Sequence, residues 1–222
     1  GMMLTCRKDM GVNSTDDLKG KTLGVWFYGN EYPFLSWMSR LGLATDGSSD
    51  GVTVLKQGWG VEPLTEGQAA CVSTMSYNEY WVVRDAGYSP EQLTVFKYQA
   101  EGASTLEDGL YVLEKNLGDS SFKDKMIRFV RASMKGWKYA EANPKEAASI
   151  ILDNDDAGVQ TEKHQVRMMG EIAKLTAGSN GALDPADYQR TVKVLMSGAS
   201  DPVITKEPSG AWTHDITNAA LN

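Results

Sequence analysis

Residues 22–42 read TLGVWFYGNEYPFLSWMSRLG and contain the pattern that decides the fold. The apolar and aromatic run 22–27 predicts a buried strand, and a glycine soon after it indicates a turn. Pro33 suits the first turn of a helix over 33–41, and Gly42 lies just beyond the end of that helix. A strand that leads through a turn into a helix is typical of open α/β sheets, in which ligands bind beyond the carboxyl ends of the strands.

Strands and helices alternate through the first half of the chain. Short β-branched or aromatic runs bounded by Gly, Asp, Ser or Pro predict strands over 2–7, 22–27, 52–56, 71–75, 93–97 and 109–113. Helices are expected between them, over 16–18, 33–41 and 77–86. This alternation favours a mostly parallel α/β sheet with helices on its faces.

The second half has helical periodicity instead. Apolar spacing and capping residues predict helices over 121–142, 144–152, 161–177 and 185–195, and an irregular tail from residue 198. We therefore expect an α/β lobe over 1–115, followed by a mainly helical part over 116–222.

Composition and charge exclude several classes of protein. Of the 222 residues, 41% are hydrophobic and 23% are charged, as in an ordinary globular protein. No run approaches the ~20 consecutive apolar residues that cross a bilayer. The net charge of −7 argues against nucleic acid or an anionic membrane as the main partner, because both need a basic surface. The amino terminus lacks the basic, apolar and small-residue segments of a signal peptide.

The sequence contains no motif for a metal, a cofactor or a catalytic nucleophile. It lacks the GxxxxGK[ST], GxGxxG and HExxH patterns, and it has no GxSxG nucleophile elbow, which requires that spacing in a turn from a strand into a helix. His164 and His214 are far apart, and we interpret both as ordinary surface or capping residues. Cys6 and Cys71 have no metal-ligand spacing, and we interpret them as small strand hydrophobes. A disulfide joins them only if their strands are neighbours.

The first candidate binding segment follows the strand at 22–27. It consists of Tyr28, Gly29, Asn30, Glu31 and Tyr32. The N–H groups at a helix start ordinarily favour an anion, but Glu31 places a carboxylate there. That carboxylate favours a ligand that donates hydrogen bonds, such as an amino-substituted ring. The alternative is that Glu31 only caps its own helix and that the aromatic side chains pack in the core.

The second candidate segment follows the strand at 71–75. Tyr77, Asn78 and Glu79 combine an aromatic face with amide and carboxylate groups, a mixture that suits a flat heterocycle. For Trp81, packing in the buried face of the helix is the better interpretation. Trp59, between two glycines, is an exposed aromatic residue and a candidate pocket wall.

Five stretches of the chain resemble a known family. MLTCRKD (3–9) and DLKGKTLGV (17–25) are similar to the opening of the second lobe in type II periplasmic solute-binding proteins. GNEYPF (29–34), YNEYW (77–81) and FVRASMKGW (129–137) resemble, more narrowly, the branch related to thiamine-pyrimidine synthesis proteins. The resemblance covers essentially the whole chain.

The resemblance implies two α/β lobes that close on a small ligand, as in the receptors of ABC importers of pyrimidine precursors. It implies a periplasmic location, a permease partner, no catalytic residues, and a site that includes the residues named above. It also implies that part of the first lobe would precede the strand at 2–7. We therefore expect weak or absent ligand binding by this chain alone. We also expect exposed apolar helix faces that are covered in a homodimer, by swapping or by rearrangement.

Two other functions are alternatives to this receptor. The first is an iron-dependent pyrimidine synthase of the same superfamily, which two separated cysteines and two distant histidines do not support. The second is a receptor for nitrate, taurine or another sulfonate. Such a receptor needs cationic or N–H groups, whereas Glu31 and Glu79 supply carboxylates.

Overall fold

The computed structural model describes residues 1–197 and 202–221. The chain divides into two compact units. The sheet unit comprises Gly1–Thr105 and Tyr188–Glu207, and the helical unit comprises Leu106–Asp187 and Pro208–Asn222. The division falls within helix α7 (Pro185–Met196). The boundary expected after residue 115 remains a prediction.

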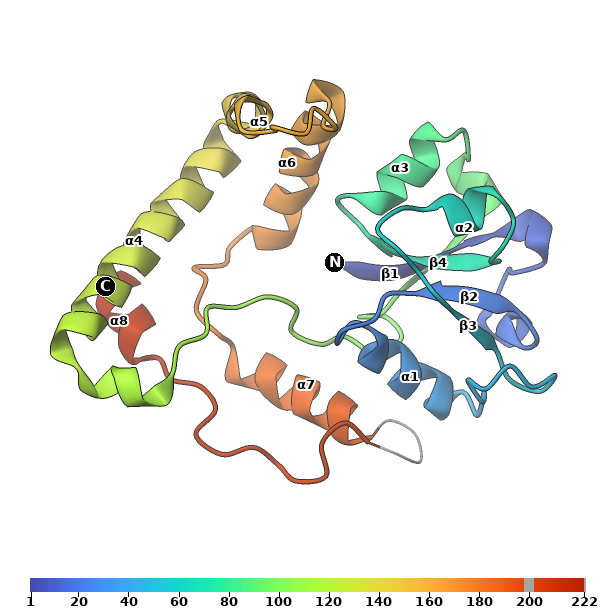
Figure 1. Ribbon diagram of the computed structural model, residues 1–222, viewed down its shortest axis with the longest axis horizontal. Helices are drawn as coiled ribbons and strands as arrows, with labels where there is room; N and C mark the ends of the chain where they lie inside the picture. Colours follow the sequence, from blue (N-terminus) through green and yellow to red (C-terminus); the bar gives the residue numbers. More distant parts are fainter. Residues whose placement is uncertain (198–201, 222) are drawn as a thin grey trace. The chain divides into compact units, whose positions relative to one another are not determined.

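The sheet unit is built on five strands in the order β3-β2-β4-β1-β5 (Figure 1). The strands are β1 (Met2–Arg7), β2 (Thr22–Val25), β3 (Thr53–Lys56), β4 (Cys71–Met75) and β5 (Leu93–Lys97). Strand β2 is parallel to β3 and β4, whereas β1 is antiparallel to β4 and β5. Four strands thus run in one direction and β1 in the other, which confirms the predicted mostly parallel α/β sheet.

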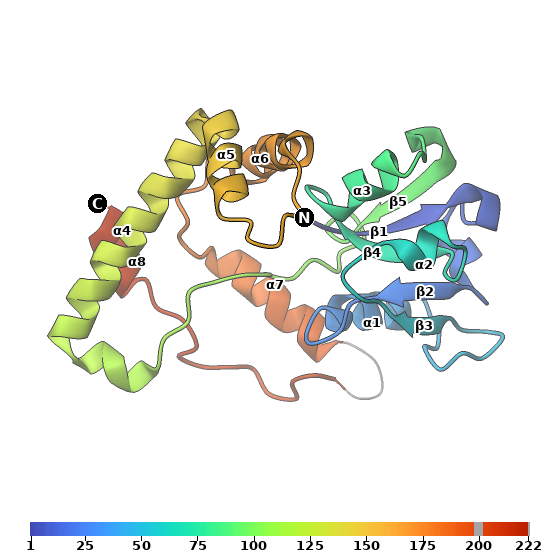
Figure 2. The same cartoon turned by 45° about the horizontal axis from the view of Figure 1, so that its top comes forward.

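Helices cover both faces of this sheet (Figure 2). Helix α1 (Glu31–Arg40) packs on one face, where Phe34 and Trp37 are buried against Leu4, Leu23 and Phe96. Helices α2 (Glu62–Thr65) and α3 (Glu79–Asp85) cover the other face, with Leu64 and Val83 against Val72 and Leu93. These two buried clusters, one on each face of the sheet, fix the strands and therefore the position of their carboxyl ends.

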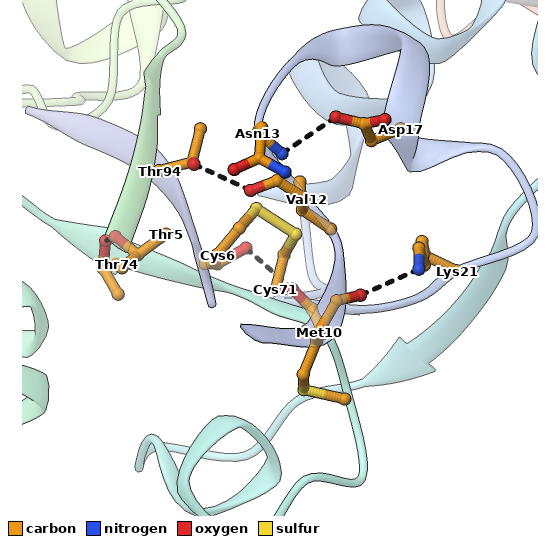
Figure 3. Close-up of a disulfide and its surroundings, with 12 residues drawn as sticks. Thr5, Cys6, Met10, Val12, Asn13, Asp17, Lys21, Cys71, Thr74 and Thr94 are labelled. Atoms are coloured by element: carbon orange, nitrogen blue, oxygen red, sulfur yellow. Dashed lines mark hydrogen bonds between the residues drawn. A yellow bond between two sulfur atoms is a disulfide. The ribbon is translucent and has the colours of Figure 1, made fainter. Parts of the chain in front are cut away.

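A disulfide between Cys6 and Cys71 joins β1 to β4 (Figure 3). The two residues face each other in the antiparallel register. The neighbouring pair, Arg7 and Ala70, is a hydrogen-bonded pair, because Arg7 N donates to Ala70 O. Pairs alternate along an antiparallel ladder, so Cys6 and Cys71 form a non-hydrogen-bonded pair, in which the side chains are closest. The interpretation of both cysteines as unlinked hydrophobes is therefore wrong, because their strands are neighbours.

The helical unit consists of α4 (Ser120–Ala142), α5 (Pro144–Asp153), α6 (Glu162–Thr176) and α8 (Asp215–Leu221), with a 3-10 turn over Glu114–Gly118. Asp119 caps α4 by accepting hydrogen bonds from the backbone N–H groups of Ser121 and Phe122. Helix α8 contacts α4, and the Arg131 guanidinium donates to the carbonyl oxygens of Ala219 and Ala220.

Two expectations fail, one for the segment 109–113 and one for the tail. The segment 109–113 is not a strand, since no strand among the described residues pairs with it. The tail is not irregular throughout, because Arg131 satisfies carbonyl groups at the end of α8 that would otherwise lack partners. Residues 198–201 of the expected tail lie outside the described residues. The helices predicted from 121, 144, 161 and 185 are present within one or two residues of their expected bounds.

Candidate functional site

The strand order creates a topological switch point in the sheet unit. From β2 the chain passes through α1 to β3 on one side, and then returns to β4 on the other side of β2. Because β2, β3 and β4 are parallel, the segments that follow them emerge at the same edge of the sheet. In open α/β sheets, ligands bind at this edge, next to the point where the strand order reverses.

Strands β2 and β4 separate as they approach that edge. Their pairing covers only Leu23 with Cys71 and Gly24 with Val72. Beyond it, the buried Gln57 side chain takes the place of a strand partner: its Nε2 donates to Ser73 O at 2.9 Å, and its Oε1 accepts from Ser73 N at 2.8 Å. Gln57 Nε2 also donates to the carbonyl oxygen of Gly60 at 3.1 Å. This amide therefore fixes the β3–α2 loop to β4.

The first candidate segment forms a tight turn between β2 and α1. Tyr28 has a φ of +65° and Gly29 has a φ of +113°, so a non-glycine residue occupies the left-handed region. Glu31, the first residue of α1, accepts a hydrogen bond from Gly29 N through Oε2 at 2.8 Å. The Tyr28 side chain is 89% exposed. The Glu31 carboxylate thus closes the turn with one oxygen, while the turn holds the Tyr28 ring out in solvent.

The second candidate segment is closed in the same way by Glu79. Its Oε2 accepts from Met75 N at 2.8 Å, and its Oε1 accepts from Asn78 Nδ2 at 2.7 Å. Burial raises the pKa of the Glu79 carboxyl above its ordinary value, against the opposing effect of these hydrogen bonds. The Trp81 indole donates to Ser76 O at 3.1 Å, so this ring packs against its own segment.

All eight predicted site residues lie in the two segments at the switch-point edge. The exposed members are Tyr28, Gly29 and Asn30, and the half-buried members are Glu31, Tyr32, Tyr77, Asn78 and Glu79. Helix α1 begins at Glu31, two residues before the expected start, and α3 begins at Glu79. Each carboxylate therefore belongs to the first residue of its helix.

Sequence reasoning missed Lys56, the last residue of β3. Its Nζ donates to the Tyr28 hydroxyl at 3.1 Å and lies 4.5 Å from the centroid of the Tyr28 ring. The same ammonium lies 5.5 Å from the centroid of the Phe27 ring. The available signal was its position at the carboxyl end of a predicted parallel strand.

The loop after β3 carries an exposed tryptophan. The Trp59 side chain is 97% exposed and lies between two glycines. The Trp26 indole donates to Gly58 O at 3.0 Å, which ties this loop to the segment after β2. The edge therefore presents two exposed rings, those of Tyr28 and Trp59, on loops joined by a hydrogen bond.

This edge gathers several groups that can make polar and stacking contacts. It offers carboxylate acceptors, an ammonium donor and exposed aromatic rings. In the part of the chain that the structure describes, no three His, Cys, Asp or Glu side chains cluster as a metal ion requires. Both cysteines are consumed by the disulfide, so neither supplies a thiolate.

This sheet order and edge define the class: an α/β lobe of the periplasmic binding-protein type. A solved structure of a protein from Bordetella bronchiseptica RB50 matches with a TM-score of 0.62 at 17% identity, over 99% of this chain and 70% of that one. The NMT1/THI5 like family model matches residues 2–147. The chain belongs to the NMT1/THI5-like family, whose members are mainly solute-binding proteins. The comparison with curated proteins gives no match.

The family gives the chain a broad role, that of a solute-binding protein with a small-molecule ligand, and members of the family are typically periplasmic. Among the helices that the structure describes, none is both long enough and apolar enough to span a bilayer.

Proposed function

We propose that this protein is the solute receptor of an ABC importer and that its ligand is a flat, amino-substituted heterocycle of the aminopyrimidine type. The observation that carries the proposal is the pair of carboxylate-closed turns at the switch point. They follow adjacent parallel strands, so both Glu31 and Glu79 belong to the edge at which such sheets bind ligands.

The residues at this edge suit an amino-substituted ring. Carboxylates accept hydrogen bonds and donate none, so Glu31 favours a ligand that carries N–H groups. The Glu31 Oε2 atom is used by Gly29 N, and the second oxygen remains to accept from a ligand. The exposed Tyr28 and Trp59 rings supply faces on which a flat ring can stack.

The disulfide supports a location outside the cytoplasm. Structural disulfides form and persist in oxidising compartments, of which the bacterial periplasm is one. The buried Cys6–Cys71 bond therefore agrees with the location typical of the family. A permease in the membrane would then receive the ligand from the closed, ligand-bound protein.

The proposal is tested by titrating the purified chain with 4-aminopyrimidine, taurine and nitrate, with thermal unfolding and calorimetry as readouts. We expect stabilisation by 4-aminopyrimidine alone, reaching about 1.4 kcal/mol at ten times its dissociation constant. Glu31→Gln should weaken binding, while its amide oxygen can still accept from Gly29 N. Glu66→Gln, an exposed carboxylate next to α2, is the matched control. Stabilisation by taurine or nitrate, with none by 4-aminopyrimidine, would refute the assignment.

One observation favours a second candidate, a receptor for sulfonates or nitrate. Lys56 supplies the cation that such ligands need, at the same edge of the sheet. The nearby carboxylates oppose a free inorganic anion, so this candidate ranks second. A synthase ranks third, because no cysteine is free to bind iron.

A further inference from the structure

The Lys56 ammonium is held at a defined position rather than extended freely into solvent. It donates to the Tyr28 hydroxyl at 3.1 Å, and it lies near the rings of both Tyr28 and Phe27. A lysine ammonium has three N–H donors, and the Tyr28 hydroxyl takes only one of them. The other two N–H groups of the Lys56 ammonium are left to donate to a ligand, and the contacts with Tyr28 and Phe27 fix the position from which they do so.

The backbone pays a conformational cost to present this arrangement. Tyr28 has a φ of +65°, a region that a bulky side chain seldom occupies. A glycine at this position would adopt the turn without that strain. The tyrosine instead provides an exposed ring and the hydroxyl that accepts from Lys56. Strain of this kind is concentrated at functional sites.

A cation and an anion are thereby fixed to consecutive residues of one turn. Lys56 is bonded to Tyr28, and Glu31 is bonded to Gly29. Among the ion pairs of residues 1–197 and 202–221, none joins Lys56 to Glu31 or to another carboxylate. Neither charge is neutralised by the other, so both can bind groups of a ligand at this turn.

We propose that Lys56 is a specificity-determining residue that binds an anionic substituent of the ligand. This inference rests on the proposed function and narrows its ligand class. The ligand is a flat heterocycle that carries an amino donor for Glu31 and a carboxylate for Lys56, on one face of the Tyr28 ring. A ring with only one of these groups leaves one charge without a partner, which lowers its affinity.

The discriminating experiment compares 4-aminopyrimidine with 4-aminopyrimidine-5-carboxylate on the full chain by calorimetry. We expect the carboxylate-bearing compound to bind about tenfold more tightly, the ratio that one charge-assisted hydrogen bond supplies. Lys56→Gln should remove that ratio, because it takes away the ammonium that binds the carboxylate. High salt should reduce the ratio as well, because the ammonium is exposed.

Lys97 offers a matched control. It is the last residue of β5 and is exposed, as Lys56 is the last residue of β3 and is exposed. In the strand order, β5 is separated from the switch point by β1. Lys97→Gln should therefore preserve the full preference for the carboxylate-bearing compound.

The outcomes separate this inference from the proposed function. Equal binding of the two compounds by the unaltered protein would overturn the role of Lys56 and leave the aminopyrimidine receptor standing. Loss of the preference in Lys97→Gln as well would show a general charge effect and would also overturn it. Failure of both compounds to bind would refute the proposed function and this inference together.

Discussion

Single residues at the switch point have structural roles in the fold that the sequence predicts only in part. The sequence placed Glu31 and Glu79 after the strands, and both lie there. From the sequence, helix capping and ligand binding were alternative roles for Glu31. In the structure, one carboxylate oxygen accepts a hydrogen bond from Gly29 N and closes the turn, and the other oxygen is left for a ligand. Gln57 and Lys56 were missed, because their contacts with Ser73 and Tyr28 are made across strands and depend on the sheet order.

Glu79 makes a prediction about pH. Burial raises the pKa of its carboxyl in the folded protein above the ordinary value of 4.5. Above about pH 4.5, the carboxyl of the unfolded chain loses its proton while the carboxyl of the folded protein still holds one. A rise in pH therefore favours the unfolded state and lowers the free energy of unfolding. Replacement by glutamine removes the titrating group. Relative to Glu79→Gln, the unaltered protein should lose stability as the pH rises above about 4.5, as measured by urea unfolding at several pH values.

Glu91 is a control for that experiment, because the pKa of its carboxyl is shifted in the opposite direction. A hydrogen bond from the Ser89 side chain lowers the pKa of the Glu91 carboxyl, so rising pH through the titration strengthens folding. The difference between the unaltered protein and Glu91→Gln should therefore move in the other direction. If Glu79→Gln and Glu91→Gln shift in the same direction, the burial of Glu79 does not determine the pH dependence.

At the scale of elements, local patterns predicted most strands and helices but not their partners. The strands β1 to β5 are predicted by apolar runs, and the starts of α4 and α7 are predicted by Asp119 and Asp184, which accept hydrogen bonds from the backbone N–H groups of Ser121 and Ala186. The segment 109–113 has the same strand-like composition, yet it forms no strand, because a strand also needs a partner edge. The pairing of β1 with β4, and hence the disulfide, involves residues far apart in the chain.

The disulfide predicts a large loss of stability when it is removed. It closes a loop of 65 residues between neighbouring strands, which corresponds to about 4 kcal/mol in the chain-entropy model. The double variant Cys6→Ala/Cys71→Ala should lose about this much in urea unfolding, and each single variant should lose a similar amount. Thiol labelling of the denatured, unreduced protein should detect no free cysteine. Two labelled cysteines, or a double variant as stable as the unaltered protein, would exclude a structural disulfide.

At the scale of the whole molecule, the exposed apolar side chains of the helical unit predict that the protein associates with itself. Of the 23 residues of α4, Val130 alone is buried, while the apolar side chains of Phe129 and Trp137 are 54% and 49% exposed. Exposed apolar surface of this kind marks interfaces, so we expect sedimentation equilibrium to show a dimer that forms as protein concentration rises. Phe129→Glu should shift the equilibrium to the monomer, because a charge in an apolar interface is costly. Val82→Glu, at an exposed apolar position on α3, should leave it unchanged. A protein that stays monomeric at every concentration would show that this surface needs no second copy to cover it.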